Sequence, residues 1–241
     1  MAETALNETV RLEIYRYDPE GSAEPTSQTY EVPVLKVGMK LLDALNYIKW
    51  NLDGTLTYRR SCAEGVCGSD GMNINGVNGL ACITDVAGLK QPIRVYPLPS
   101  MQVIRDLVVD TTHFFEQYRS IKPWLQAVSP LPEHERLQSI EEREALDGMY
   151  ECVLCGCCTT ACPSWWWNGN RFLGPAALLQ ADRWIRDTRD EAAGQRLDAL
   201  EDAFKLYRCH QIMNCMEACP KGLNPTAAIN HIKRTLLARK S

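Results

Sequence analysis

Apolar and polar residues alternate along the first hundred positions with the two-residue period of β-strands. Residues 11–17 (RLEIYRY) and 29–35 (TYEVPVL) follow this pattern, and residues 18–21 (DPEG) between them are typical of a turn. A hairpin is therefore predicted. Residues 41–52 (LLDALNYIKWNL) change to the 3.6-residue period of a helix, which we expect to pack on the sheet.

Further strand signals follow this predicted helix. The segment 72–86 (MNINGVNGLACITDV) contains the dipeptide Asn-Gly at 75–76 and again at 78–79, and both are turn signals between short strands. Residues 93–98 (IRVYPL) close the region. The first part of the chain is thus predicted to be an α+β domain.

The pattern becomes helical from about residue 106. Helices are predicted over residues 104–118, 139–152, 175–188, 195–209 and 224–240. Ser139 with Glu142 forms a capping-box pattern, and Pro175 is a helix-start signal. Three prolines in 120–135 indicate an ordered connector. We therefore expect two domains, residues 1–105 and an all-α domain of residues 106–241.

Composition narrows the class of protein. At 241 residues the chain is long enough for two domains, and its 45% apolar and 23% charged residues are typical of globular proteins. A net charge of −4 gives no basic surface for nucleic acid, so no nucleic-acid partner is expected. No run of about 18 apolar residues is present, so the sequence is not expected to span a membrane.

Eleven cysteines are the unusual feature of the composition. The opening MAETALNETV resembles neither a secretory signal nor a transit peptide, which favours a cytoplasmic location. Thiols stay reduced there, so clustered cysteines are expected to bind metal rather than to form disulfides.

One cysteine run completes the ferredoxin pattern C-x2-C-x2-C-x3-C-P. Residues 152–163 (CVLCGCCTTACP) match it without a gap. A zinc site is the alternative, but it needs only four ligands and does not require the closing proline or a second matching run. Cys157 lies inside the run but outside the pattern, and its expected role is that of a buried thiol.

A second run, residues 209–220 (CHQIMNCMEACP), matches the same pattern except that Ile212 stands in the second cysteine position. In two-cluster ferredoxins the fourth cysteine of each run binds the other run's cluster. One cluster then receives Cys152, Cys155, Cys158 and Cys219, and the other receives Cys162, Cys209 and Cys215. Because an aliphatic side chain cannot bind iron, Ile212 predicts a 3Fe-4S cluster beside a 4Fe-4S cluster.

The third run has the plant-type spacing of a 2Fe-2S site, C-x4-C-x2-C…C. Cys62, Cys67 and Cys82 occupy three of the positions and Asp70 occupies the other. Asp70 is expected to be a carboxylate ligand to iron. A surface acid beside a cluster completed differently is the alternative.

Three different clusters in one chain indicate serial one-electron transfer. Three consecutive tryptophans, at 165–167, cannot all face one side of a regular element, so at least one is expected to meet a partner or ligand. His210 follows a ligand cysteine and is either a surface residue or a donor to the electron acceptor. Basic residues near the C-terminus complement a helix end or attract anionic lipid.

Taken in order, the segments CAEGVCGSDGMNINGVNGLAC, CVLCGCCTTACPSWWWN and CHQIMNCMEACP resemble the iron-sulfur subunits of succinate dehydrogenase, respiratory complex II. The similarity runs from about residue 10 to the C-terminus. It implies a β-grasp 2Fe-2S ferredoxin-like domain followed by an all-α domain of the bacterial two-cluster ferredoxin type.

The resemblance also implies partners and a quinone site. It implies a flavoprotein subunit with covalent FAD, membrane anchor subunits that often carry haem b, and peripheral association with the cytoplasmic face of the bacterial inner membrane. Electrons would pass from FAD through the 2Fe-2S, 4Fe-4S and 3Fe-4S clusters to quinone. By position, Trp167 matches the family's quinone hydrogen-bond donor. The residues that match the lining of the quinone pocket are Pro163, Ser164, Trp166, His210 and Ile212.

Two alternatives use the same clusters. A fumarate reductase subunit has the same architecture with the reaction reversed, but Asp70 and His210 favour succinate oxidation. A soluble ferredoxin-like carrier would lack a quinone site, and the tryptophan run argues against it. No flavin-binding glycine motif is present, so the dicarboxylate site is expected on another chain.

Overall fold

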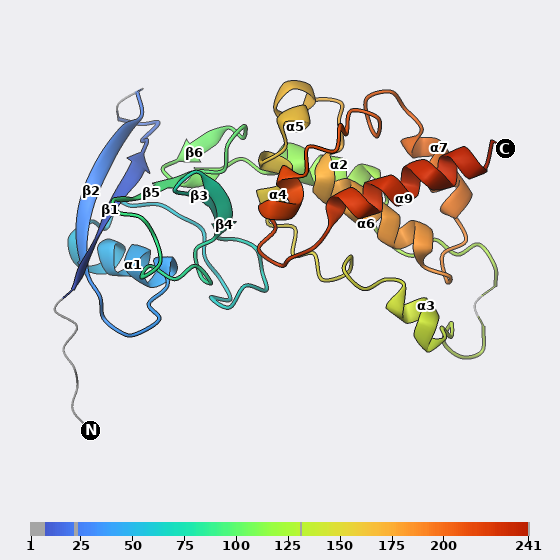
Figure 1. Cartoon of the computed structure of the whole chain (residues 1–241), viewed down its shortest axis with the longest axis horizontal. Coiled ribbons are helices and arrows are strands. Elements are labelled where there is room, and N and C mark those ends of the chain that lie inside the picture. The colour runs from blue at the N-terminus through green and yellow to red at the C-terminus, as the bar shows by residue number, and fades with distance from the viewer. Residues whose placement is uncertain (1–7, 22–23, 131, 241) are drawn as a thin grey trace. The chain divides into compact units, whose positions relative to one another are not determined.

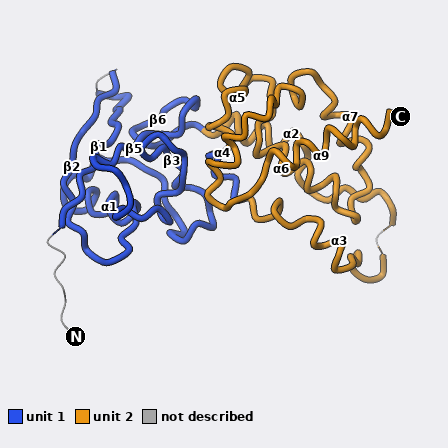
Figure 2. The backbone as a smooth tube through the Cα atoms, in the orientation of Figure 1, with its two compact units in different colours: residues 1–110, 153–157 blue, residues 111–152, 158–241 orange. Residues whose placement is uncertain are grey.

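The computed structural model describes residues 8–21, 24–130 and 132–240 (Figure 1). The opening residues 1–7 lie outside this range. The chain forms two compact units: residues 1–110 with 153–157, and residues 111–152 with 158–241 (Figure 2). The short segment 153–157 thus belongs to the first unit although it lies far along the sequence.

The first unit is built on a five-stranded mixed sheet in the order β2-β1-β5-β3-β4. Its strands are β1 (Thr9–Arg16), β2 (Thr26–Pro33), β3 (Gly71–Ile74), β4 (Val77–Leu80) and β5 (Ile93–Tyr96). Strand β1 pairs antiparallel with β2 and parallel with β5, and Leu12 is opposite Tyr30 on one side and Ile93 on the other. The predicted hairpin is confirmed, and the backbone N–H of Gly21 donates to Asp18 O at 3.2 Å in its turn.

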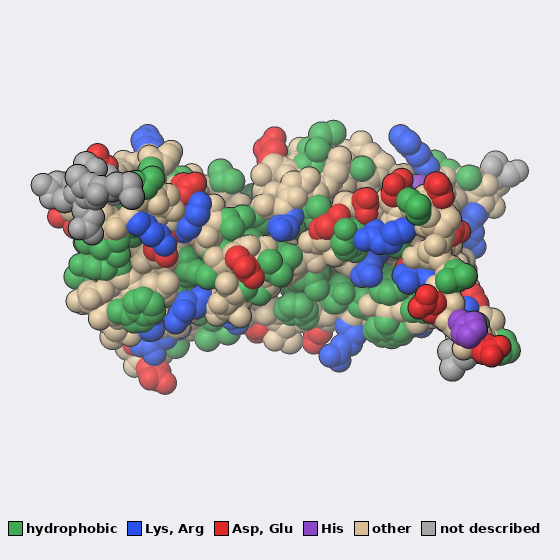
Figure 3. Space-filling model, turned by 90° about the horizontal axis from the view of Figure 1, so that it is seen from below, with side chains coloured by type: hydrophobic (Ala, Val, Ile, Leu, Met, Phe, Trp, Pro, Cys, Tyr) green, Lys and Arg blue, Asp and Glu red, His purple; other side chains and the backbone are tan. Residues whose placement is uncertain are grey.

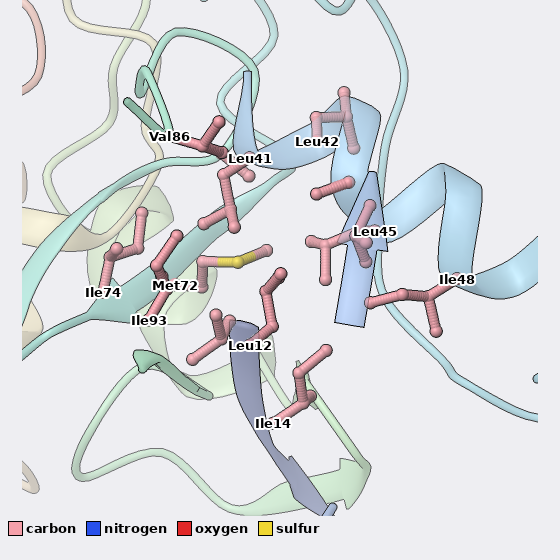
Figure 4. Packing of buried hydrophobic residues seen from close by; sticks show 14 of the residues in the cluster. Leu12, Ile14, Leu41, Leu42, Leu45, Ile48, Met72, Ile74, Val86 and Ile93 are labelled. Carbon is pink, nitrogen blue, oxygen red and sulfur yellow. The ribbon is translucent and has the colours of Figure 1, made fainter. Parts of the chain in front are cut away.

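One helix covers the apolar face of this sheet. Helix α1 (Leu41–Tyr47) continues as a π-helical turn, η1 (Ile48–Leu52), so the predicted helix 41–52 is confirmed. Figure 4 shows Leu12 and Ile14 of β1 pointing toward Leu45 of α1 and Met72 of β3, and all four side chains are buried. Alternate strand positions and one helix face therefore form the core of this unit, as the two periodicities predict.

Two predictions in this unit are wrong because distant contacts override the local signals. The dipeptide at 78–79 was expected to turn, but it lies inside β4, which pairs with β3. The helix expected from residue 104 begins later: a hairpin of β6 (Val103–Arg105) and β7 (Val108–Val109) precedes α2 (Thr112–Ser120). The carboxylate of buried Asp106 accepts from the backbone N–H groups of Tyr17 and Thr57 at 2.9 and 2.8 Å, which stabilises this turn.

The second unit is all-α, as expected, and its two longest helices lie side by side (Figure 1). These are α6 (Gly174–Arg186), with Pro175 in its first turn, and α9 (Pro225–Ala238). The Asn224 side chain accepts from the backbone N–H of Ala227 at 2.9 Å and caps α9. Both predicted helices are confirmed, and Pro175 and Asn224 are in the first-turn and capping roles that favour helix starts.

Two other predicted helices are shorter than expected. Ser139 and Glu142 form the predicted capping box, but α3 ends after Ile140–Glu144, and Gly148 then adopts a φ of 79°. Helix α7 (Ala193–Leu200) stops because Asp202 accepts from the backbone N–H groups that follow it. Three short helices that we did not predict lie in the cysteine runs: α4 (Cys157–Thr160), α5 (Pro163–Asn168) and α8 (Asn214–Glu217).

The connector is held by one buried arginine. Arg196 donates to the backbone oxygens of Ile121, Lys122 and Trp124 at 2.8–2.9 Å, and it pairs with the carboxylate of Asp190 at 2.7 Å. The prediction of an ordered connector is therefore confirmed for the residues described.

The basic residues near the C-terminus bind acidic groups of their own unit. His231 Nδ1 lies 2.6 Å from Asp182 Oδ1, Arg239 pairs with Asp198 at 2.9 Å, and Lys240 pairs with Glu201. Figure 3 shows Lys and Arg side chains interspersed with Asp and Glu on one face of the molecule. Within the ranges described, no helix combines the length and apolar character needed to cross a bilayer.

The core of the first unit generates a stability prediction. Replacing the fully buried Leu45 with Ala should lower the free energy of unfolding by about 2–5 kcal/mol, because a cavity is left against β1 and β3. Urea unfolding followed by circular dichroism measures this change. The matched control is Val77→Ala, at a side chain that is 59% exposed, where we expect a change within about 0.5 kcal/mol. Equal losses in the two variants would contradict the assigned core.

Candidate iron-sulfur centres

Left-handed backbone conformations are concentrated in the three cysteine runs. A residue with positive φ reverses the chain locally, so that cysteines three to six residues apart can turn their side chains toward a common centre. When the runs are numbered by their order in the chain, the first is 62–82, the second 152–163 and the third 209–220. The residues and their φ values are Ala63 (60°), Gly65 (74°) and Gly68 (69°) in the first run, Leu154 (53°) and Gly156 (81°) in the second, and Gln211 (58°) and Met213 (73°) in the third. Positive φ angles are uncommon in residues other than glycine. Their presence in each run therefore indicates that the backbone turns the cysteine sulfurs toward one another.

In the first run the backbone curls around the sulfur of Cys62. The N–H groups of Glu64, Val66 and Cys67 donate to this sulfur at 3.5, 3.3 and 3.3 Å. Burial opposes ionisation of Cys67, but hydrogen bonds from the side chain and backbone of Ser69 outweigh it and lower the pKa of this thiol to about 7. The loop therefore stabilises sulfur as thiolate, the form that binds iron.

Asp70 is buried next to Cys82, with only 3% of its surface exposed, so the alternative of a surface acid is wrong. Its Oδ2 accepts from the backbone N–H of Cys82 at 2.6 Å, while its buried Oδ1 has no hydrogen-bond partner among the described residues. Burial, followed by the Asp70 carboxylate, raises the pKa of Cys82 to about 12. An orphaned carboxylate oxygen beside a ligand thiol is costly unless a cation binds there. The donor set thus fits iron.

Gly68 lets the second run approach the first. A Cβ atom built on this residue would lie 2.5 Å from the carbonyl oxygen of Val153 and 3.0 Å from Cβ of Cys155, so only glycine fits. All three residues belong to the first unit. Two cysteine runs that are distant in sequence are therefore in direct contact.

The remaining thiols predicted for the 4Fe-4S site belong to the second unit. Cys152 and Cys219 pack against the same apolar cluster, whose buried members are Leu146, Met149, Leu179, Leu223 and Ala228. The backbone N–H of Leu223 donates to the sulfur of Cys219 at 3.3 Å. Cys158, six residues after Cys152, is also buried, in α4. Cys219 of the third run and Cys152 at the start of the second therefore pack against one apolar cluster, which is the arrangement that the predicted exchange requires.

The thiols predicted for the 3Fe-4S site line one pocket in the second unit. Cys162, Cys209 and Cys215 meet there with Ile212, which is half exposed at its rim. The predicted quinone-site residues Pro163, Ser164 and His210 also line this pocket. The position at which the sequence pattern lacks a cysteine therefore lies in the same pocket as the three thiols, and it carries the aliphatic side chain of Ile212.

Electrostatics in this pocket also favour a bound cation. Burial is the main cause that raises the pKa of Cys162 and of Cys215, and the charge of a neighbouring thiolate, Cys209, raises both further. Three thiolates cannot be held together in a buried pocket without positive charge. An iron-containing cluster supplies that charge.

Contacts from α9 to this pocket were not predicted from the sequence. The hydroxyl of Thr226 lies 3.3 Å from the sulfur of Cys215, and Lys233 Nζ donates to the backbone oxygen of Cys209 at 2.9 Å. The sequence carries no local signal for either contact, because both depend on how α9 packs after Asn224.

The three tryptophans do point in different directions. Trp165 is buried and its indole N–H donates to Gln117 Oε1 at 3.0 Å. The indole of Trp166 is 44% exposed and donates to the backbone oxygen of Thr160. Trp167 is 78% exposed, and its N–H has no partner within the described part of the chain. Of these three consecutive indoles, Trp167 is therefore the one available to a molecule outside this unit.

Within the ranges described, no three Cys, His, Asp or Glu side chains lie close enough together to bind one ion. A 4Fe-4S cluster makes a different demand on its ligands, because each of its thiolates binds a different iron.

Family models and a relative agree with the predicted 2Fe-2S and 4Fe-4S domains. Residues 11–116 match the 2Fe-2S iron-sulfur cluster binding domain and residues 148–223 match the 4Fe-4S dicluster domain. The succinate dehydrogenase iron-sulfur subunit of Paracoccus denitrificans is 57% identical over 229 residues, which cover 95% of this chain and 88% of the relative. The chain belongs to the family of succinate dehydrogenase iron-sulfur subunits.

Solved structures support this membership. A chain of the Mycobacterium smegmatis Sdh1 complex in the apo form superposes with a TM-score of 0.87 at 25% identity, covering 97% of this chain and 98% of that one. A hypothetical protein from Helicobacter pylori, at 14% identity and a TM-score of 0.58, shares only the fold over 98% of this chain and 41% of its own.

Membership of this family confirms the predicted fold class and the role in electron transfer within succinate dehydrogenase. It favours that role over fumarate reduction and over a soluble carrier. The individual ligand and quinone-site residues stay predictions, and the geometry above is the support for them.

Proposed function

We propose that the chain carries electrons one at a time from the flavin of a partner flavoprotein to quinone, through one 2Fe-2S, one 4Fe-4S and one 3Fe-4S cluster. Flavin and quinone each exchange two electrons, whereas each cluster carries one, so a relay of clusters joins the two reactions. The observation that carries the proposal is the pocket in which Cys162, Cys209 and Cys215 face Ile212 and the quinone-site residues.

The ligands proposed for each cluster follow from the spacing of the cysteine runs. Cys62, Cys67, Asp70 and Cys82 hold the 2Fe-2S cluster, and Cys152, Cys155, Cys158 and Cys219 hold the 4Fe-4S cluster. Cys162, Cys209 and Cys215 hold the 3Fe-4S cluster. The approach of Gly68 to Cys155 supports transfer from the first cluster to the second, because the two ligand runs touch there.

Quinone binds at the 3Fe-4S pocket. The donor is the exposed indole N–H of Trp167, which stabilises a quinone carbonyl as it gains charge. Pro163, Ser164, His210 and Ile212 form the wall. Trp166 does not line the pocket itself and is proposed to join the site next to Trp167. Membrane anchor subunits complete the site, with haem b where those subunits carry it. Covalent FAD lies on the flavoprotein. The complex places this subunit on the cytoplasmic face of the bacterial inner membrane.

The quinone assignment is tested by separating two activities of the assembled complex. Trp167→Leu should lower succinate:quinone reduction roughly tenfold, equivalent to one lost hydrogen bond in the transition state, while reduction of an artificial dye by succinate survives. Trp50→Leu, at another exposed tryptophan, is the matched control and should leave the ratio of the two activities unchanged. Equal loss of both activities in Trp167→Leu would count against a quinone contact.

The missing-ligand explanation of Ile212 is tested by electron paramagnetic resonance of the air-oxidised complex. An oxidised 3Fe-4S cluster has an odd electron count and gives a signal, whereas oxidised 2Fe-2S and 4Fe-4S clusters are spin-paired. Ile212→Cys supplies the fourth thiolate, so the signal should disappear and one more iron should be bound. Ile212→Val adds no ligand and should retain the signal. An intact three-iron signal in Ile212→Cys would refute the explanation.

Ligation by Asp70 is tested by two substitutions. Asp70→Ala removes the only oxygen donor, and we expect loss of most 2Fe-2S signal in the succinate- or dithionite-reduced complex. Asp70→Cys restores a donor of the usual kind, and we expect full cluster content with altered g values. Iron and sulfide analysis accompanies the spectra. A normal 2Fe-2S spectrum in Asp70→Ala would show that the carboxylate does not bind iron.

A further inference from the structure

Helix α9 places a hydroxyl group at one of the ligands proposed for the 3Fe-4S cluster. Oγ1 of Thr226, in the first turn of α9, lies 3.3 Å from the sulfur of Cys215. Both residues are buried and both line the pocket of the predicted 3Fe-4S site. Within the described part of the chain, this sulfur is the one hydrogen-bond partner of the hydroxyl.

The hydroxyl stands out on its own helix face, because every other buried position of α9 is apolar. Those positions are Pro225, Ala228, Ile229, Ile232 and Leu236. A buried hydroxyl without an acceptor is destabilising, whereas a valine would fill nearly the same space with no polar atom. The sulfur of Cys215 therefore accounts for a hydroxyl at this buried position.

Two further contacts hold α9 against the same cysteine run. Asn230 Oδ1 accepts from the side-chain amide of Gln211, and Lys233 Nζ donates to the backbone oxygen of Cys209 at 2.9 Å. With Thr226 these helix residues are spaced four and three positions apart, which places them on one face of α9. The helix backbone thus fixes where the hydroxyl lies, and the β-branched side chain has few rotamers in a helix.

Iron binding determines which of the two groups donates. A neutral thiol can donate or accept in this contact. Iron binds the thiolate, which carries no hydrogen, so only the Thr226 hydroxyl can donate once Cys215 is a cluster ligand. A charged acceptor in a buried site of low dielectric forms a stronger hydrogen bond than a neutral one in water.

We propose that Thr226 is a positioning residue whose hydroxyl donates a hydrogen bond to the Cys215 ligand and thereby raises the reduction potential of the 3Fe-4S cluster. The proposal rests on the proposed function, in which Cys215 binds that cluster. Hydrogen bonds to cluster sulfurs raise the potential because the reduced cluster carries more negative charge and gains more from a donor. In the proposed relay this cluster is the last before quinone, so a raised potential favours arrival of the electron there.

The test is a redox titration of the assembled complex in which electron paramagnetic resonance follows the oxidised 3Fe-4S signal. Thr226→Val keeps the size and branching of the side chain and removes the donor. The oxidised-to-reduced ratio of this cluster at a fixed potential should rise roughly tenfold, a shift of about 59 mV toward lower potential for one electron. Thr226→Ser keeps the hydroxyl and should retain most of the wild-type midpoint. The midpoints of the 2Fe-2S and 4Fe-4S clusters should not move in either variant.

Thr235→Val is the matched control on the same helix. The Thr235 hydroxyl donates to the backbone oxygen of His231 at 2.9 Å rather than to a predicted ligand, so the 3Fe-4S midpoint should stay at the wild-type value. A second readout is electron-nuclear double resonance of the oxidised cluster in deuterated buffer. An exchangeable proton coupling should be present in the wild type and in Thr226→Ser, and it should be weakened in Thr226→Val.

The outcomes separate this inference from the proposed function. Full iron and sulfide content with an unchanged 3Fe-4S midpoint in Thr226→Val overturns the role of Thr226 alone. An equal shift in Thr235→Val, or in Thr226→Ser, assigns the effect to packing and also overturns it. If Thr226→Val fails to assemble, absence of an exchangeable coupling in the wild type still overturns the donation. Absence of any 3Fe-4S signal in the air-oxidised wild-type complex overturns the proposed function and this inference together.

Discussion

Convergence of closely spaced thiols on one inorganic core is the constraint on which the rest of this molecule depends. Ordinary strands and helices turn side chains two or three residues apart in different directions, so the chain must adopt positive φ angles between the cysteines. At non-glycine residues such as Leu154 and Gln211 this costs about 1–2 kcal/mol each. Iron-sulfur bonds offset that cost, which ties the local fold of each run to cluster binding.

The negative charge of clustered cysteine sulfurs is the second constraint, and the runs compensate for it in different ways. Around Cys62 the backbone supplies three N–H donors, so the loop of the first run directs its hydrogen bonds at this sulfur. Around Cys215 the thiols are buried and oppose one another's ionisation, so the pocket depends on iron for neutrality. Ile212 lowers the number of negative ligands there, which suits a cluster that accepts electrons readily.

Two residues, Asp70 and Cys157, depart from the ferredoxin cysteine patterns and lie next to predicted cluster ligands. Asp70 places an oxygen where a plant-type site has sulfur, and its buried Oδ1 has no partner among the described residues, which leaves it free for the proposed bond to iron. Cys157 lies between two predicted ligand positions, and its carbonyl oxygen accepts from the side-chain amide of Asn78 at 3.0 Å. In a relay of one-electron carriers, the reduction potentials of successive clusters must allow each transfer. Hydrogen bonds to single sulfurs change the reduction potential of a cluster without changing the number of its ligands.

The sequence by itself determined the order of the 2Fe-2S and 4Fe-4S domains and the two longest helices of the second unit. These depend on spacing and on local start signals such as Pro175 and Asn224. The 3Fe-4S cluster and the exchange of the fourth cysteines stay predictions from the same spacing. Only the tertiary structure decided that the chain turns at Asp106, that Asp70 is buried, and which of the three tryptophans is exposed. Cluster ligands are encoded locally because the bonds to iron require fixed short intervals, whereas burial and donor identity are set by residues far apart in the chain, such as Gly68 with Val153 and Asn78 with Cys157.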